Sequence, residues 1–258
     1  MAIALFERGS TVPWCRPFRP RPRGACCVTV SKPPERPDPA IYSQNQQIQA
    51  GQIPTWDSPD IVTNRFVPWT LHAETEVTVR NLSPLVAAVN TQVQLSVSAF
   101  GIGLSETPLS AQIVTLAPAA AMTLKFPLTQ DILKGDQSIA VFVDLYHPND
   151  LVAINSHGAQ AISGFDTKSA GRHVTRHFPV ANPTGAAQLI SLAALPNNLA
   201  ATVAPASHTF APFEQISASL TVTVPAGMHN AEERVTVIAH GAGGSVVGGV
   251  TFVVTVND

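Results

Sequence analysis

The chain has 258 residues, enough for one large domain or for two domains that each bury a core of their own. Apolar residues make up 45% of the chain and charged residues only 12%, and the formal net charge of −2 gives the folded part no electrostatic attraction for nucleic acid. The 22 prolines and 16 glycines predict many turns and few long helices.

Residues 1–53 have the composition of an extended arm. Eight prolines lie between Pro13 and Pro39, and residues 1–40 hold seven basic residues against three acidic ones. Such a segment is expected to be polyproline-like without a packed core, serving as a solvated tether or contacting an anionic surface. Within it, ACCVTV (25–30) could add as an edge strand to the chain's own body or to a neighbour.

The arm also holds all three cysteines, Cys15, Cys26 and Cys27, which leaves no disulfide for the folded part. Vicinal Cys26 and Cys27 do not pair readily, and there is no CxxC motif, so a buried or idle thiol pair is favoured over a zinc site.

The start of the chain shows no recognisable secretory signal, and no apolar run approaches the roughly 18 residues of a membrane span. We therefore expect no membrane insertion. The localisation stays open at this point, and association with a surface or a particle is the favoured hypothesis.

From residue 54 onward, apolar side chains recur at every second position in runs separated by Pro, Gly and Asn. In QVQLSVSA (92–99) valine and leucine alternate with glutamine and serine, and QSIAVFVDLY (137–146) is apolar on both faces, like a central strand. Only TQDILKGD (129–136) favours a helical turn. Further strands are expected at 75–81, 216–224, 233–239 and 250–256. The pattern predicts an antiparallel sandwich rather than alternating strands and helices.

The chain repeats one plan twice. VRNLSPLVAAV (79–89) and VANPTGAAQLI (180–190) each read as a strand, an Asn turn and a second strand, and similar runs follow both. We therefore predict an all-β chain of two tandem immunoglobulin-like antiparallel β-sandwiches, over 54–166 and 172–258, behind the extended Pro/Arg-rich N-terminal arm. A linker is expected near GFDTKSAGRH (164–173), and the absence of a Cys…Trp…Cys core separates both sandwiches from antibody-type domains.

Two stretches of the first half resemble a known bacterial family. TWDSPDIV (55–62), followed by EVTVRNLSPLVAAVNTQVQLSV (76–97), is similar to the opening of CARDB-type domains, the cell adhesion related domain found in bacteria. VFVDLYHPNDLVAINSHGAQA (141–161) resembles the closing hairpin of that family, although Asn155–Ser156 stands where the family has Asn–Asn, and an alanine precedes Gln160.

The resemblance covers about residues 40–162, and the second half is similar only to generic bacterial immunoglobulin-like modules. It implies a non-enzymatic extracellular or particle-borne module for adhesion or scaffolding, with no catalytic residues to carry over.

The stretch DLYHPNDLVAINSHGAQ (144–160) is the most polar candidate site. Oxygen ligands for calcium could come from this stretch and from TWDSPDI, namely Asp144, Asp150, Asn155, Asp57 and Asp60. The Gly and the final Glu of an EF-hand are missing, and His-Pro-Asn-Asp has the composition of a β-turn in which Asn and Asp satisfy backbone groups. The structural interpretation is favoured for both stretches, so we expect no metal, no cofactor and no catalytic residue.

Two further motifs favour structure over chemistry. His173 and His177 would share a helix face suited to zinc, but their segment leads into a predicted strand, where positions four apart lie about 13 Å from each other. AHGAGGSVVGG (239–249) resembles an oxyanion loop, yet no G-x-S-x-G motif occurs in the chain, and a glycine-rich hairpin between the last two strands is favoured.

These observations predict a structural or interaction protein that is not an enzyme. It would assemble with itself or with another protein through its β-sandwich surfaces and the N-terminal arm. A carbohydrate- or calcium-binding accessory module is the alternative, with a glycan as the partner in the first case. A hydrolase is a third alternative, which requires His147, Asp150 and His157 to cluster around a deep pocket.

Overall fold

The computed structural model describes residues 35–63, 74–128, 138–150, 152–168, 173–195 and 198–257. These residues form sandwich-like β-sheets, which confirms the all-β prediction at this level. Their helical segments are short, namely α1 (Gln44–Gln49) and the 3₁₀ turns η1 (Ala153–Asn155) and η2 (Ala242–Gly244). No helix in these ranges is long and apolar enough to cross a membrane. The three cysteines, the strand candidate at 25–30 and the helical turn expected at 129–136 lie outside the described residues.

The strands of the first half form two layers around one apolar core. Strands β1 (Pro39–Ala40), β2 (Ile61–Val62) and β6 (Ala121–Pro127) each pair antiparallel with β3 (Glu74–Asn81). The other layer consists of β4 (Ala88–Ala99), β5 (Thr107–Leu116), β7 (Ile139–Tyr146) and the start of β8 (His157–Lys168). Alternate residues of both layers share the core, as the period-2 pattern predicts, among them Val77, Phe126, Leu95 and Val143.

The second half repeats this layering. A three-stranded sheet contains β11 (Ala200–Ala204), β13 (Gln215–Thr223) and β9 (His173–Ala181). The other layer contains β12 (Ser207–Phe210), β10 (Gln188–Ala194), β14 (Ala231–His240) and β15 (Val246–Asn257). The predicted glycine-rich hairpin is confirmed, since β14 and β15 pair antiparallel on either side of it. The core between the layers includes Val180, Leu220, Val237 and Phe252.

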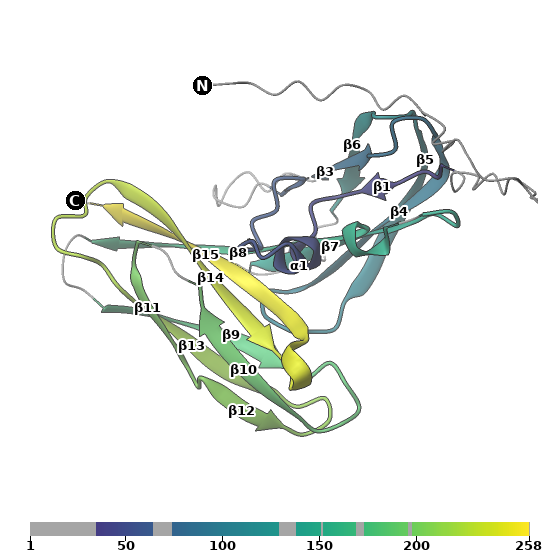
Figure 1. Ribbon diagram of the computed structural model, residues 1–258. Coiled ribbons are helices and arrows are strands. Elements are labelled where there is room, and N and C mark those ends of the chain that lie inside the picture. The colour runs from purple at the N-terminus through teal and green to yellow at the C-terminus, as the bar shows by residue number, and fades with distance from the viewer. Residues whose placement is uncertain are drawn as a thin grey trace, which may run out of the picture. The chain divides into compact units, whose positions relative to one another are not determined.

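One eight-stranded sheet runs through both halves, in the order β12-β10-β14-β15-β8-β7-β4-β5. Strand β8 makes the join, because residues 157–161 pair antiparallel with β7 and residues 162–168 pair parallel with β15 (Figure 1). The sequence predicts a linker that begins near residue 164, whereas this part of the chain continues β8. Phe165 is buried there, and its ring centroid lies 6.3 Å from that of Phe252.

The stretch TWDSPDIV lies across this join. Trp56 belongs to the first half, but its side chain is buried in the core of the second half. Its N–H donates to the Thr251 hydroxyl at 3.0 Å, and its carbonyl accepts from the Ala161 N–H at 2.8 Å. Its ring lies against Gly249, where a Cβ atom would come within 2.5 Å of ring carbon Cζ3. Trp56 therefore packs the first half onto β15.

The loop between β4 and β5 makes a second contact between the halves. The Ile102 N–H donates to the Pro179 carbonyl at 3.0 Å, and the Ile102 carbonyl accepts from the Ala181 N–H at 2.8 Å. Gly103 has a φ of +68°, and a Cβ atom there would lie 2.3 Å from the Ala181 carbonyl oxygen. The loop can approach β9 this closely because residue 103 is glycine.

Two buried asparagines confirm the repeated turn of the sequence plan. Asn81 and Asn182 each accept, through Oδ1, the N–H two residues later in the chain. Asn81 Nδ2 donates to the Val86 carbonyl at 2.8 Å, and Asn182 Nδ2 donates to the Ala186 carbonyl at 2.7 Å. In each half the asparagine thus ties its own turn together at the end of a strand.

Residues 35–53, which the sequence assigns to the extended arm, lie against the sheets in this structure. The Ile41 N–H donates to the Asn155 carbonyl at 2.9 Å, next to the pairing of β1 with β3. Gln44 of α1 is buried, and its side-chain amide exchanges two hydrogen bonds with the backbone of Ala159, at 2.7 and 3.2 Å. The rest of the predicted arm, residues 1–34, lies outside the described part of the chain.

Candidate functional site

Asp60, one of the five candidate calcium ligands, is a buried carboxylate with several partners. Both terminal nitrogens of Arg80 on β3 donate to it, Nη2 to Oδ1 at 2.6 Å. The Tyr42 N–H donates to Oδ2 at 2.7 Å, and the N–H of Asp60 itself donates to the Ser58 hydroxyl at 3.3 Å. Both carboxylate oxygens are therefore engaged in holding the TWDSPD turn to β3.

Asp57 has a different partner in the other half of the chain. Its Oδ2 accepts from Nε of Arg234 on β14 at 2.8 Å, and its N–H donates to the Thr55 hydroxyl at 3.0 Å. Asp57 and Asp60 stand three positions apart in one turn, yet each carboxylate pairs with its own arginine. The two carboxylates thus connect this turn to β3 and to β14, which is a structural role.

The candidates of the stretch 144–160 also have partners within the chain. The Asp150 N–H donates to the His147 carbonyl at 3.1 Å, and Asp150 Oδ1 accepts from the Val152 N–H at 3.0 Å, which confirms the predicted β-turn whose Asp satisfies a backbone group. Asn155 is buried, and its Nδ2 donates to Asp38 at 2.9 Å. Within the described ranges, no group of three or more His, Cys, Asp or Glu side chains is arranged to hold a metal ion.

Asp144 belongs to a different group of side chains, on the outer face of β4 and β7. Register places Gln92 beside Tyr146 and Gln94 beside Asp144, and Tyr146 is 56% exposed. A shallow hollow of about 670 Å³ lies over these strands. We call its lining the polar face; it consists of Gln92, Gln94, Ser96, Glu106, Pro108, Asp144 and Tyr146.

His157 on β8 borders the polar face and interacts with the carboxylate of Asp144 in that face. Its Nδ1 lies 2.7 Å from Asp144 Oδ1, and its ring stacks on Phe142 with centroids 6.2 Å apart. Burial opposes the charged imidazole, but the hydrogen bond to Asp144 and the charges of Asp144 and Glu106 outweigh it and raise the pKa of His157. Burial raises the pKa of Glu106, and the charge of Asp144 raises the pKa of Tyr146.

Sequence reasoning singled out Asp144 and missed Glu106 and the two glutamines of the polar face. Gln92 and Gln94 occupy the polar side of an alternating strand, where glutamine is ordinary. Only the pairing of β4 with β7 brings them beside Asp144. The one sequence signal was that this strand alternates glutamine and serine, without the lysine and glutamate of a common solvated face.

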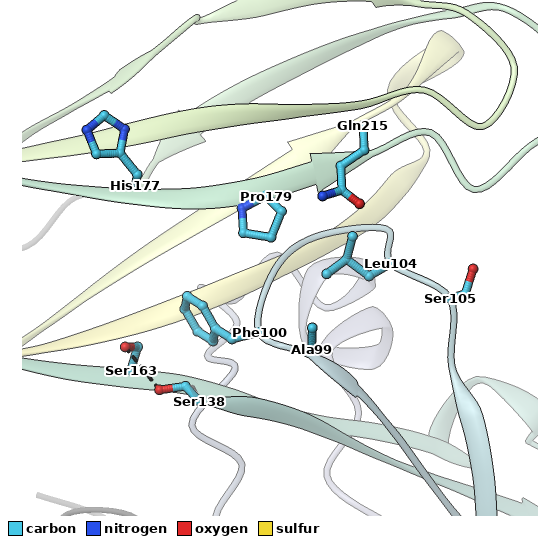
Figure 2. A pocket seen from close by; sticks show the side chains of 9 residues that line it. All are labelled: Ala99, Phe100, Leu104, Ser105, Ser138, Ser163, His177, Pro179 and Gln215. Carbon is cyan, nitrogen blue, oxygen red and sulfur yellow. Dashed lines mark hydrogen bonds between the residues drawn. The ribbon is translucent and has the colours of Figure 1, made fainter. Parts of the chain in front are cut away.

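A second hollow of about 650 Å³ lies between the β4–β5 loop and β9 (Figure 2). Its lining is Ala99, Phe100, Leu104, Ser105, Ser138, Ser163, His177, Pro179 and Gln215. Ser138 donates to the Ser163 hydroxyl at 3.2 Å. No carboxylate occurs among these lining residues, so the lining offers no pair of carboxylates for acid and base catalysis.

Two further histidines, His147 and His173, have hydrogen-bond partners of their own. His173 and His177 lie on β9, and His173 Nδ1 is 2.8 Å from the Thr223 hydroxyl. Nε2 of His147 lies 3.1 Å from the Val89 carbonyl. Each member of the trio that the hydrolase alternative needs, His147, Asp150 and His157, therefore hydrogen-bonds a different group.

Strand β5 is an open edge of the eight-stranded sheet. It pairs with β4 on one side, and no described strand pairs with the backbone of its other side. The side chain of Gln112 donates to the Lys125 carbonyl of β6 at 2.7 Å. Its ten residues, TPLSAQIVTL, include none with a charge, and Ile113 is 72% exposed. Edge strands are usually protected by charge, proline, bulges or short length. In β5, Pro108 and one break in register lie at the beginning and a second break lies near the end, while residues 110–114 pair with β4 in regular register.

No model of a known protein family matches the chain, and no curated protein matches its sequence. Among solved structures, the chain is similar to the transglutaminase of red sea bream, with 13% identity and a TM-score of 0.24 over 82% of this chain and 33% of that one. It is also similar to a family 2 glycosyl hydrolase from Bacteroides cellulosilyticus, with 14% identity and a TM-score of 0.22 over 78% of this chain and 25% of that one. Similarity this weak, to a third or a quarter of a much longer chain, carries no argument about function.

Proposed function

We propose that this chain is a non-enzymatic structural module of two tandem immunoglobulin-like sandwiches, which assembles with a second copy of itself through β5. The open, uncharged edge of β5 is the observation that carries the proposal. The two layered stacks, the repeated asparagine turn and the resemblance of residues 55–62 to CARDB-type domains support the immunoglobulin-like part.

The edge of a sheet presents a row of N–H and C=O groups that a further strand can bind. Two copies of β5 can pair antiparallel about a two-fold axis at Ile113, which sets Ile113 opposite itself and Ala111 opposite Thr115. Because the strand has no charge, no like charges meet across this pair. The same surface serves both copies, so the assembly closes at a dimer.

The low charge of the chain agrees with surface that is buried in an assembly. In this proposal the dimer is associated with a surface or a particle. The Pro- and Arg-rich residues 1–34, which lie outside the described residues, act as its tether.

Sedimentation velocity of the full chain, from about 1 to 300 µM, tests the dimer. Ile113→Lys sets two lysines opposite each other and is expected to leave only monomer. Because Ile113 is exposed, the melting temperature should be unchanged at concentrations where the wild-type chain is also monomeric. Thr202→Lys on edge strand β11 places the same charge on another exposed position and should leave the dimer intact. A wild-type chain that stays monomeric at the highest concentration, or a dimer that survives Ile113→Lys, would overturn the proposal.

A disulfide trap tests the register. In a chain whose native cysteines are replaced by serine, Ile113→Cys should form a covalent dimer on mild oxidation, because directly opposed positions of antiparallel strands lie about 4.5–5.5 Å apart between Cα atoms. Thr202→Cys, the matched control, should not. Equal cross-linking by both variants would indicate random collision instead of β5 pairing.

A further inference from the structure

The composition of the polar face differs from that of an ordinary solvent-exposed sheet surface. Its glutamines, Asp144 and Tyr146 stand on the solvent side of β4 and β7, whose other sides contribute apolar residues to the core. Ordinary solvated faces carry scattered charged and small polar residues. This one gathers two amides, two carboxylic acids and an exposed phenol ring around a single hollow.

We propose that the polar face binds a neutral saccharide chain. A sugar ring offers C–H groups on its faces and adjacent hydroxyl groups at its edge. The negative face of an aromatic ring attracts the C–H groups, and planar amide or carboxylate side chains can bind hydroxyl groups. Tyr146 supplies the ring, Gln92 lies beside it, and Asp144 with Gln94 forms the neighbouring pair of positions.

Hydrogen bonds hold two of the polar side chains, Gln94 and Asp144, in place before any ligand arrives. Gln94 Nε2 donates to the carbonyls of Leu95 and Ser110, at 3.0 and 2.9 Å. His157 holds Asp144 Oδ1 at 2.7 Å. Among the described residues, no donor is bonded to Gln94 Oε1 or to Asp144 Oδ2, so both atoms are acceptors for sugar hydroxyls. Side chains fixed in this way lose little entropy on binding.

The charge of the polar face selects the class of saccharide. Its lining includes Glu106 and Asp144 and no lysine or arginine. Uronic acids, sulfated sugars and phosphates would meet these carboxylates and be repelled, whereas a neutral sugar would not. The hollow is shallow and open, which suits the interior of a chain better than a small molecule that must be enclosed.

Isothermal titration calorimetry of the full chain tests this inference. Cellohexaose, mannohexaose and fully N-acetylated chitohexaose are neutral probes with different hydroxyl geometries, and hexagalacturonate is an anionic probe of similar length. We expect binding of at least one neutral probe, and binding of hexagalacturonate that is at least about tenfold weaker. No binding of any neutral probe, or equal binding of the anionic one, would overturn the proposal.

Variants locate the site. Tyr146→Ala should weaken binding of the neutral probe about tenfold, because it removes the ring that contacts the sugar. Phe213→Ala removes another exposed aromatic ring, which lies outside the polar face and is 71% exposed, and it should leave the affinity unchanged. Melting temperatures verify that both variants are folded. Unchanged affinity in Tyr146→Ala, or equal loss in Phe213→Ala, would place the sugar elsewhere and contradict the inference.

Discussion

Replacing Gly249 by alanine tests whether Trp56 packs the two halves together. A Cβ atom there would lie 2.5, 2.6 and 2.7 Å from three carbons of the Trp56 ring. Carbon atoms in contact are about 3.5–4.0 Å apart, so the ring or strand β15 would have to move by roughly 1 Å. The ring is buried, and the N–H of the same residue is held by Thr251. Because overpacking of this kind costs about 1–3 kcal/mol, we expect Gly249→Ala to lower the free energy of unfolding by about 2 kcal/mol.

A double-mutant cycle separates this clash from a general effect of alanine on β15. Trp56→Ala alone should cost about 3–5 kcal/mol, because it empties a buried site. In that background the added Cβ meets no ring, so Gly249→Ala should cost less than about 0.5 kcal/mol, and the two substitutions should be coupled by about 1.5 kcal/mol. Urea unfolding followed by far-UV circular dichroism gives these free energies. The same cost for Gly249→Ala in both backgrounds would refute the packing role of Trp56.

Two further predictions concern carboxylates. Asp60→Ala leaves the Tyr42 N–H and a guanidinium without their acceptor and should lower the free energy of unfolding by about 3 kcal/mol. Asp57→Ala should cost less than about 1 kcal/mol in the same urea titration, because the side chain of Asp57 is 23% exposed whereas that of Asp60 is 4% exposed. The reverse order would contradict the structural assignment of these residues. Asp144→Asn should lower the pKa of His157, measured by NMR titration of the ring. The pKa of His157 in the folded chain is raised above its ordinary value of 6.5, so protonated His157 stabilises the native chain fully below that pH. This contribution to the free energy of unfolding is lost as the pH rises through the folded-state pKa. Asp144→Asn should remove this pH dependence of stability.

The strands could be predicted because each depends on a local alternation of side chains. The run at 92–99, for example, falls within β4. Their partners could not be predicted in the same way, since the parallel pairing of β8 with β15 joins residues that are distant in sequence. Gly164 and Asp166 read as part of a turn-rich linker, and this segment becomes strand because β15 lies beside it and Phe165 enters the shared core. Tertiary pairing overrides the weak local preference of such a segment.

Only part of the candidate site could be predicted from the sequence, for a similar reason. Asp144 and His157 flank one hairpin, so they attract attention together, while Glu106 joins them only through the folded sheet. Asp57 and Asp60 look alike in a turn whether they bind calcium or arginine. The arginines that distinguish the two cases come from β3 and β14, far along the chain.

Pairing through β5 would change what the polar face can do. The two-fold axis of an antiparallel strand pair runs perpendicular to the sheet, so the polar faces of two copies would lie on the same side. Five strand spacings of about 4.8 Å would then separate the two β7 strands, or about 24 Å. A polysaccharide that spans this distance would bind both copies, and the second contact would be intramolecular. The dimer should therefore hold a polymer more tightly than a disaccharide, which is too short to reach both copies. Ile113→Lys should remove that difference, because a monomer offers only one polar face.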